Sequence, residues 1–297
     1  MLELAVLGSG SSGNSALVCL GDTRILIDAG LSARQLCVRL EALGIDPDSL
    51  SAIVLTHEHG DHTRGIDVFC RKRSIPVYAT NHTCSIVRES VRCEVAWHQF
   101  EAGREFRIGE ISVETFSVPH DAVDPVGFVF GCGESRVGVL SDVGHVTRMI
   151  IERLRDVDTL FTESNYDEKM LQNDTRRPWA IKQRISNRHG HLSNEQTAEL
   201  VLEIASPRLK QVILGHLSSD CNCPELAAEV IRTALRKDGF GDVAVECAKR
   251  KDPLPLRTAA LPAIPREEKT AKSSRVCESE PAPPSAPQQW QQGEWAF

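Results

Sequence analysis

The run Leu-Thr-His-Glu-His-Gly-Asp-His at residues 55–62 constrains this chain more than any other feature. It gathers three imidazoles and one carboxylate, those of His57, His59, His62 and Asp61. The run follows the apolar segment 51–55, which we predict to be a short buried strand, and loops at strand ends are where α/β folds build their sites. His57 and His59 can point to one side of such a loop, and Asp61 and His62 can point to another side. The run therefore predicts a site for two adjacent metal ions, in preference to a polar loop that happens to contain histidines.

The run resembles the His-x-His-x-Asp-His signature of the metallo-β-lactamase-fold hydrolases. That family requires further ligands, and three candidates follow apolar, strand-like segments in the family's order. They are His120 in Ser-Val-Pro-His-Asp, Asp142 in Val-Leu-Ser-Asp and His216 in Val-Ile-Leu-Gly-His. The resemblance therefore covers about residues 1–250 of the chain.

The family resemblance implies two groups of three ligands and one bridging carboxylate: His57, His59 and His120; Asp61, His62 and His216; and Asp142. Imidazoles and carboxylates suit Zn²⁺ or Mn²⁺, with Fe²⁺ a further candidate, and this mixed set discriminates poorly among them. Two such ions acidify a bridging water and neutralise charge on the attacked and leaving oxygens. The resemblance thus implies a hydrolase with two divalent metal ions per chain, in which Asp61 also counts as a catalytic residue.

A narrower resemblance rests on six segments that look, in order and wording, like the YycJ branch (also called WalJ or VicX) of that superfamily. They are Leu-Gly-Ser-Gly-Ser-Ser-Gly-Asn-Ser (7–15), Leu-Ile-Asp-Ala-Gly-Leu-Ser (26–32), Pro-His-Asp-Ala-x-x-Pro-Val-Gly-Phe (119–128), Glu-Ser-Asn-Tyr-Asp (163–167), Gly-His-Leu-Ser-Asn (190–194) and Leu-Gly-His-Leu-Ser (214–218). This branch is regarded as metal-dependent DNA exonuclease-like proteins. It implies exonucleolytic hydrolysis of DNA phosphodiesters, with a metal-bridging hydroxide that attacks phosphorus in line with the leaving oxygen.

These segments offer further candidate residues. The glycine-rich loop at 8–15 can expose amides and hydroxyls to an anion, because glycine permits positive φ and close approach, and we take its Ser12 and Asn14 as substrate-binding candidates. A tight turn between two strands is the alternative for this loop. Asp28 resembles a family carboxylate that orients metal ligands without binding metal itself. Asn165 is a third substrate-binding candidate, and the roles of its neighbours Glu163 and Ser164 stay open.

His191 lies shortly before a predicted helix. Ser193 and Gln196 match the capping-box pattern ahead of a helical apolar periodicity, so His191 falls near a helix N-terminus, where phosphate binding is favoured. In ribonuclease Z-like relatives a histidine at a similar place contacts the scissile phosphate or protonates the leaving oxygen. His191 is therefore the candidate general acid, and a histidine that only belongs to the capping region is the alternative.

A net charge of −7 does not indicate a long non-specific nucleic-acid surface, which normally presents a basic stripe. Local basic groups remain, and Arg176 and Arg177, followed by Lys182 and Arg184, lie between two of the branch segments. We predict that Arg176 and Arg177 form a rim that binds substrate phosphates, with ordinary solvated charges as the alternative. The expected partner is nucleic acid, and DNA in particular.

The short spacing between His120 and Asp142 leaves no room for the long arm with which ribonuclease Z grips transfer RNA. A compact phosphodiesterase or exonuclease remains. A small-molecule phosphodiesterase or a glyoxalase II-like thioester hydrolase stays open as the alternative, because either would use the same metals. A non-catalytic regulatory protein is a third hypothesis, which the complete ligand set disfavours.

Hydrophobic periodicity predicts two runs of strands, each flanked by helices. The strands fall at 3–7, 15–20, 24–28, 52–55, 77–79, 93–97, 111–118, 126–131, 136–140, 158–162, 211–214 and 243–246. The helices fall at 32–43, 63–73, 81–90, 147–154, 178–186, 194–205 and 224–237. This order fits an α/β fold, the four-layer αβ/βα metallo-β-lactamase sandwich, with the site at one edge between the sheets.

From Pro253 the composition changes to Pro, Ala, Gln, Ser and charges, which predicts a hydrolase domain at 1–250 and a disordered tail at 253–297. A chain that ends near Lys251 is therefore expected to fold. The terminal aromatic residues Trp290, Trp295 and Phe297 are a candidate motif for binding an unknown protein, with an idle terminus as the alternative.

The ten cysteines are spread along the chain, without a signal-peptide pattern or an apolar run of membrane-spanning length. We therefore expect a cytoplasmic protein with reduced thiols and no membrane partner. Cys221-x-Cys223 follows His216 closely, but a lone Cys-x-Cys is a weak metal signal. The oligomeric state stays open.

Overall fold

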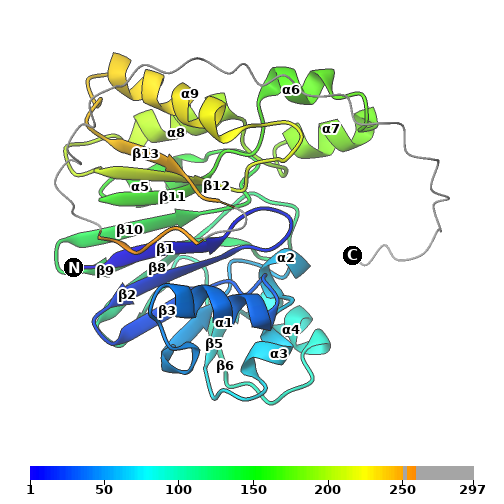
Figure 1. The fold of residues 1–297 in the computed structure, drawn as a ribbon, viewed down its shortest axis with the longest axis vertical. Helices are drawn as coiled ribbons and strands as arrows, with labels where there is room; N and C mark the ends of the chain where they lie inside the picture. Colours follow the sequence, from blue (N-terminus) through cyan, green and yellow to red (C-terminus); the bar gives the residue numbers. More distant parts are fainter. Residues whose placement is uncertain (250–252, 259–297) are drawn as a thin grey trace. The chain divides into compact units, whose positions relative to one another are not determined.

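The fold is known from a computed structural model that describes residues 1–249 and 253–258. The chain divides into two units, 1–263 and 264–297, and every described residue belongs to the first. Within that unit two seven-stranded sheets face one another, and helices cover the outer side of each sheet (Figure 1). The predicted four-layer sandwich is confirmed. The predicted tail lies outside the described residues, apart from 253–258.

The first sheet has the strand order β14-β1-β2-β3-β4-β5-β6. Its strands are β1 (Glu3–Gly8), β2 (Ser15–Leu20), β3 (Thr23–Ile27), β4 (Ala52–Val54), β5 (Val77–Thr80), β6 (Trp97–Phe100) and β14 (Arg257–Thr258). The helical segments in this half are α1 (Ala33–Ala42), η1 (Pro47–Ser49), α2 (Gly60–Thr63), α3 (Ile66–Cys70) and α4 (Asn81–Ser90). A core that includes Leu36 of α1, Phe69 of α3 and Leu26 of β3 joins the outer helices to the sheet.

The second sheet has the order β13-β12-β11-β10-β9-β8-β7. Its strands are β7 (Glu105–Ile108), β8 (Ile111–Ser117), β9 (Val126–Cys132), β10 (Ser135–Leu140), β11 (Thr159–Glu163), β12 (Gln211–Gly215) and β13 (Ala244–Cys247). Its helices are α5 (Arg148–Leu154), α6 (Glu168–Asn173), α7 (Trp179–Ser186), α8 (Asn194–Ile204) and α9 (Pro224–Lys237). α5, α8 and α9 pack on its outer face, and Phe128 and Phe130 of β9 help to fill the space between the sheets.

Each sheet contains a parallel half, β3-β4-β5-β6 in the first and β10-β11-β12-β13 in the second. Parallel strands joined by helical crossovers all end at the same edge of a sheet, and this is where such folds bind ligands. The segments that follow β3, β4, β10, β11 and β12 contain most of the site residues predicted from the sequence. The topology therefore accounts for their convergence.

The structure differs from the predicted elements in several places. The helix predicted over 63–73 is two short helices, α2 and α3, separated near Gly65. A side chain at Gly65 would approach the carbonyl oxygen of Leu31 to 2.2 Å, so this position packs backbone against backbone. The strand predicted at 93–97 begins only at Trp97, because β6 pairs with β5 from Val77↔Trp97 onward. The strands β7 and β14, the short helix α6 and the 3₁₀ helix η1 were missed.

Residues 253–258, which the sequence assigned to the tail, pack on the domain. The Leu254 side chain is 7% exposed and joins the core between the sheets, and its backbone N–H donates to Val6 O at 2.9 Å. β14 pairs with β1, and Arg257 forms an ion pair with Glu246 at 3.1 Å. The domain therefore extends at least to Thr258, beyond the boundary predicted at residue 250.

The packing of Leu254 predicts a difference between two truncated chains. A chain that ends at Thr258 should unfold with the same free energy as the full chain. A chain that ends at Lys249 should lose about 2–5 kcal/mol, the usual cost of removing a buried leucine side chain. Urea unfolding of the two chains measures this difference, and equal midpoints would show that residues 253–258 contribute nothing to stability.

Two further expectations concern membranes and thiols. Within residues 1–249 and 253–258, no helix is both long and apolar enough to cross a bilayer. The nine cysteines in the same residues are all free thiols. Cys221 is buried, and its sulfur lies 3.6 Å from Arg177 Nη1 and 3.7 Å from Asp174 Oδ2, which favours a packing role over a metal site.

Candidate metal centre

Three of the predicted site residues adopt a backbone conformation that is rare outside glycine. Asp28, Asp142 and His216 have φ values of 57°, 55° and 50°, and each follows closely after the end of a strand. Asp, Asn and His tolerate this left-handed region better than most residues, at a cost of about 1–3 kcal/mol each. In the described chain these three are the non-glycine residues with positive φ. Their occurrence at one edge of the sheets makes that edge the candidate functional site.

The ligand loop at 57–62 is held by backbone contacts with two neighbouring segments. The N–H of Asn14 donates to Asp61 O at 2.7 Å, and the N–H of Ala29 donates to His62 O at 2.7 Å. Gly30 permits this approach, because a Cβ there would lie 1.6 Å from Asp61 O. The Asp-Ala-Gly segment after β3 and the glycine-rich loop after β1 therefore fix the position of the ligand loop.

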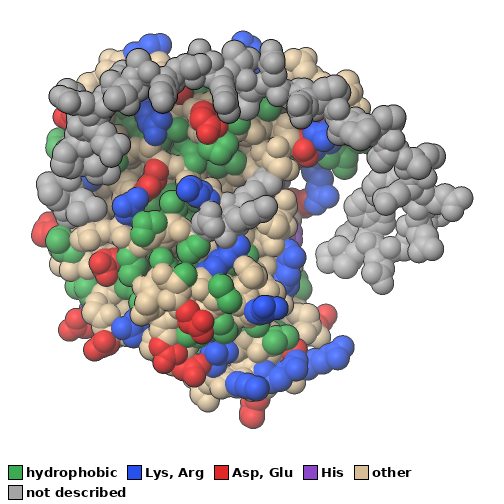
Figure 2. All heavy atoms as spheres, viewed as in Figure 1, with side chains coloured by type: hydrophobic (Ala, Val, Ile, Leu, Met, Phe, Trp, Pro, Cys, Tyr) green, Lys and Arg blue, Asp and Glu red, His purple; other side chains and the backbone are tan. Residues whose placement is uncertain are grey.

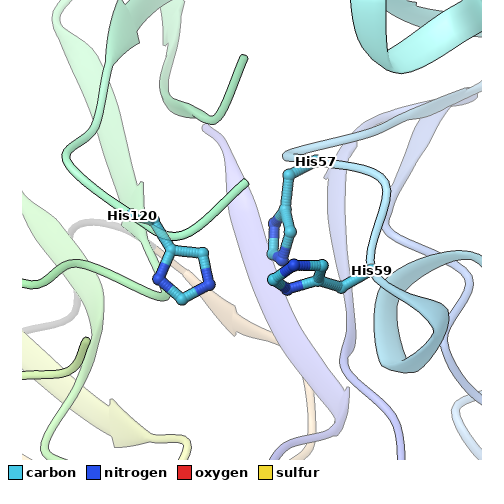
Figure 3. Close-up of side chains that lie close together, drawn as sticks. All are labelled: His57, His59 and His120. Atoms are coloured by element: carbon cyan, nitrogen blue, oxygen red, sulfur yellow. The ribbon is translucent and has the colours of Figure 1, made fainter. Parts of the chain in front are cut away.

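His57, His59 and His120 form the first group of candidate ligands. Their imidazoles point toward one another from the loops after β4 and β8 (Figure 3), and one nitrogen of each lies within 4.8 Å of the others. His57 Nδ1 lies 2.9 Å from Thr56 Oγ1, whereas its buried Nε2 has no hydrogen-bond partner among the described residues. Burial lowers the pKa of His57 and of His120, which favours neutral imidazoles. A buried, unpaired nitrogen in a group of neutral imidazoles fits a divalent transition metal.

His62 and Asp142 lie at the centre of the second group. Asp28 Oδ2 lies 2.7 Å from His62 Nδ1, so His62 Nε2 is the nitrogen directed toward the candidate ligands. That Nε2 lies 3.1 Å from Asp142 Oδ2 and 3.7 Å from Asp61 Oδ2. The other oxygen of Asp142 lies 2.8 Å from His216 Nδ1. The carboxylate of Asp142 thus stands between two histidines, as a bridging ligand would.

The structure gives Glu163 a position that the sequence left open. Its buried carboxylate accepts hydrogen bonds from the N–H groups of Val143 at 2.6 Å and Leu192 at 3.3 Å, and its Oε2 lies 2.9 Å from His191 Nδ1. Burial lowers the pKa of His191, but the charge of Glu163, its hydrogen bond to His191 and the charges of Asp142 and Asp61 together outweigh burial, and the pKa rises to about 9. Glu163 also forms a candidate metal group with Asp142, His191 and His216. The sequence signals for Glu163 were the branch segment Glu-Ser-Asn-Tyr-Asp, which begins with it, and the strand-like segment that precedes it.

The predicted capping box of α8 is confirmed. Ser193 accepts from the N–H of Gln196, and the Gln196 side chain accepts from the N–H of Ser193. His191 precedes this cap and lines the same cleft as Asp61 and Asp142. The cleft has a volume of about 500 Å³. Its other lining residues come from the glycine-rich loop, from the ligand loops and from α7 with the segment after it: Ser11, His59, His120, Asp121, Ile181, Arg184, Ile185, Asn187, His189, Gly190 and His216.

Three of the substrate-binding candidates take positions different from those expected. Asn14 is buried, and its Nδ2 lies 3.1 Å from Asp61 Oδ2 and 2.9 Å from His62 Nε2, so it supports candidate ligands. Asn165 donates through Nδ2 to His216 O at 2.7 Å and supports that residue in the same way. Ser12 is exposed, and its neighbour Ser11 is the residue of this loop that lines the cleft.

Arg176 and Arg177 also differ from the expected rim. Arg176 Nη2 lies 2.8 Å from Asp220 Oδ1, and Arg177 Nη2 lies 2.7 Å from Asp220 Oδ2. Arg177 also pairs with Asp174. Two carboxylates therefore already neutralise both guanidinium groups, and both lie outside the set of described residues that line the cleft. Arg184, further along the same segment, is the arginine that reaches the cleft.

Comparison with known proteins identifies the family. The family described as "Beta-lactamase superfamily domain" matches residues 23–217. The chain belongs to this superfamily. Exodeoxyribonuclease YycJ of Bacillus anthracis is 33% identical over 243 residues, which cover 81% of this chain and 91% of the relative. Exodeoxyribonuclease WalJ of Streptococcus pneumoniae serotype 2 is 36% identical over 243 residues, which cover 80% of this chain and 90% of the relative. The predicted branch is confirmed, and the chain is a metal-dependent hydrolase.

Solved structures agree with the fold. The metallo-β-lactamase fold protein YhfI from Bacillus subtilis aligns with a TM-score of 0.64 at 16% identity, over 85% of this chain and 99% of that protein. A diphosphatase from the PhnP family aligns with a TM-score of 0.62 at 20% identity, over 87% of this chain and 99% of that protein. At such identities the likeness shows the fold alone.

Proposed function

We propose that the chain is an exodeoxyribonuclease that hydrolyses DNA phosphodiester bonds with two divalent metal ions. The observation that carries this proposal is the likeness to YycJ and WalJ, which extends over four fifths of the chain, together with a cleft lined by the candidate ligands. The donor set supports metal binding independently, because His57 Nε2 is buried and unpaired among the described residues.

We assign the candidate ligands to the two groups that the family implies. His57, His59 and His120, whose ligand nitrogens lie together, would hold one ion. Asp61, His62 and His216 would hold the other, and Asp142 would contribute to both. By proximity among the described residues, His62 groups with His57 and Asp142, whereas His216 groups with Asp142, Glu163 and His191. When bound, two divalent ions would make water acidic near neutral pH and neutralise charge on the phosphate. Zn²⁺ and Mn²⁺ both suit these donors.

The remaining residues orient the ligands and transfer a proton. The Asp28 carboxylate accepts from the N–H of Thr56 and lies 2.7 Å from His62 Nδ1, so one carboxylate fixes both the ligand loop and one imidazole. Glu163 holds His191 through Nδ1, which leaves Nε2 for the substrate. During hydrolysis a water molecule releases a proton to solvent and its oxygen bonds to phosphorus, the bond from phosphorus to the leaving oxygen breaks, and His191 gives that oxygen a proton. The uncharged leaving group can then depart.

A substrate panel tests this function. Metal-stripped protein, with Mn²⁺ or Zn²⁺ restored, is given 5′-labelled duplex DNA, single-stranded DNA, RNA, bis-p-nitrophenyl phosphate and a thioester. We expect metal-dependent release of nucleotides from DNA ends at a rate well above that on RNA. The stripped protein without added metal serves as the control. Turnover of the small ester or the thioester without any degradation of DNA would instead establish a small-molecule phosphodiesterase or a glyoxalase II-like hydrolase.

A further inference from the structure

One wall of the cleft is an exposed helix. Ile181, Arg184 and Ile185 of α7 line the cleft, and their spacing places them on a single helical face. Every residue of α7, which lies wholly within the described chain, is at least partly exposed. A helix whose lining residues combine two apolar side chains with a guanidinium differs in chemistry from the histidines and carboxylates that also line the cleft. This wall therefore suits a part of the substrate other than the reacting phosphate.

Arg184 is held by a weak ion pair at the edge of the cleft. Its Nη2 and Nε lie 2.9 Å and 3.2 Å from the same oxygen of Asp121. The side chains of Arg184 and Asp121 are 61% and 59% exposed, and such exposed pairs contribute only about 0–1 kcal/mol. A phosphate could replace the carboxylate at little cost, since a guanidinium forms charge-assisted hydrogen bonds with the oxygens of either anion.

The surroundings of the cleft also favour an anion. Arg64 is exposed on the ligand-loop side, and its Nη2 lies 3.5 Å from the carbonyl oxygen of Ser11, a residue that lines the cleft. Figure 2 shows Lys and Arg side chains along the edge of the molecule near α2. Positive charge is therefore present locally although the whole chain carries −7.

We propose that the α7 wall is a subsite for the nucleotide next to the scissile bond. Arg184 binds the neighbouring phosphate in place of Asp121, and Ile181 and Ile185 contact the apolar face of the base. A cleft of about 500 Å³ can hold such a unit beside the reacting phosphate, because ligand pockets typically measure about 300–1,000 Å³. This inference rests on the proposed function, and it adds that the substrate is a strand with at least two phosphates.

Steady-state kinetics of Arg184→Gln test the subsite. The metal-loaded variant is compared with the unaltered protein on an eight-nucleotide oligothymidylate and on bis-p-nitrophenyl phosphate, which has a single phosphate. We expect KM for the oligonucleotide to rise by roughly tenfold or more, the effect of losing a charged hydrogen bond. KM for the single-phosphate ester should rise by less than about threefold, since this ester has no neighbouring phosphate for Arg184 to bind. The slope of log affinity against log salt should also fall by about 0.7, the value for one contact to a single strand.

Two further variants separate the subsite from general charge effects. Lys182→Gln removes the same charge from the same helix, but Lys182 Nζ donates to Gln172 O at 2.6 Å, away from the lining face, so this variant should leave KM unchanged. Asp121→Asn frees Arg184 and removes a competing carboxylate. It should lower KM for the oligonucleotide by roughly two- to fivefold, the equivalent of a weak exposed ion pair.

The outcomes distinguish this inference from the proposed function. If the unaltered protein hydrolyses oligothymidylate but the Arg184→Gln variant has the same KM and the same salt slope, the subsite proposal is wrong and the proposed nuclease function is retained. Equal losses from Arg184→Gln and Lys182→Gln would also overturn the subsite, since only net charge would matter. If the unaltered protein does not act on the oligonucleotide at all, the proposed function fails and this inference fails with it.

Discussion

Replacement of Asp142 by alanine should abolish hydrolysis and reduce the bound metal well below two ions per chain. Its two carboxylate oxygens lie 3.1 Å from His62 Nε2 and 2.8 Å from His216 Nδ1, so its loss would affect both candidate ion sites. Loss of a residue that only supports a ligand lowers activity or metal affinity by roughly 10–100-fold, and a shared ligand should cost more. Metal analysis after gel filtration, together with turnover of bis-p-nitrophenyl phosphate, measures both effects.

Two companion variants control for a folding defect. Asp142→Asn keeps the shape of the side chain, and asparagine tolerates the φ of 55° better than alanine does. Asp158→Asn alters another buried carboxylate, which accepts a hydrogen bond from the N–H of Arg136. Asp158 lies just before β11, at the opposite end of that strand from Glu163. We expect Asp142→Asn to fold but to lose metal and activity, and Asp158→Asn to retain both. Full metal content with full turnover in Asp142→Ala would remove the bridging assignment.

The sequence predicted strands and helices well wherever the local sequence alone carried the signal. The segments around β2, β8 and β9 are dominated by apolar and β-branched residues, and the helices α4 and α9 were predicted with the bounds that they have. The missed strand β7 alternates Glu105 and Arg107 with Phe106 and Ile108, a half-buried pattern too short to stand out. β14 has two residues and exists only because β1 offers a free edge. Such elements depend on tertiary pairing, which local sequence does not reveal.

The site could be predicted where a strand end and a metal-binding residue type coincide. His57, Asp142 and His216 satisfy both conditions, and the structure places Asp142 in a candidate metal group with each of the two histidines. Arg176 and Arg177 satisfied neither condition. Their interpretation rested on charge and on their place between two branch segments, and neither reveals that Asp174 and Asp220 lie beside them. Asn14 was misplaced for a similar reason. Whether a loop amide faces substrate or a ligand depends on how two distant loops pack.

His191→Ala should keep the metal content and reduce turnover of DNA by roughly 10²–10⁴, the usual contribution of one positioned proton donor. The structure supports this role because Glu163 holds Nδ1 at 2.9 Å while the imidazole lines the cleft beside Asp61 and Asp142. Metal analysis and single-turnover cleavage of DNA give the two readouts. His98→Ala, which removes an exposed imidazole on β6, is the matched control and should behave like the unaltered protein.

The dependence on the leaving group decides between proton donation and phosphate binding by His191. p-Nitrophenolate leaves without much protonation, whereas the sugar oxygen of DNA must receive a proton, so a general acid matters far more for DNA. We therefore expect the His191→Ala variant to hydrolyse bis-p-nitrophenyl phosphate at a rate within about tenfold of that of the unaltered protein, while it loses most of its activity on DNA. Equal losses on both substrates would assign His191 to phosphate binding. A loss of bound metal would assign it to the ligands, since His191 Nδ1 lies only 3.7 Å from Asp142 Oδ1 and shares a candidate metal group with His216.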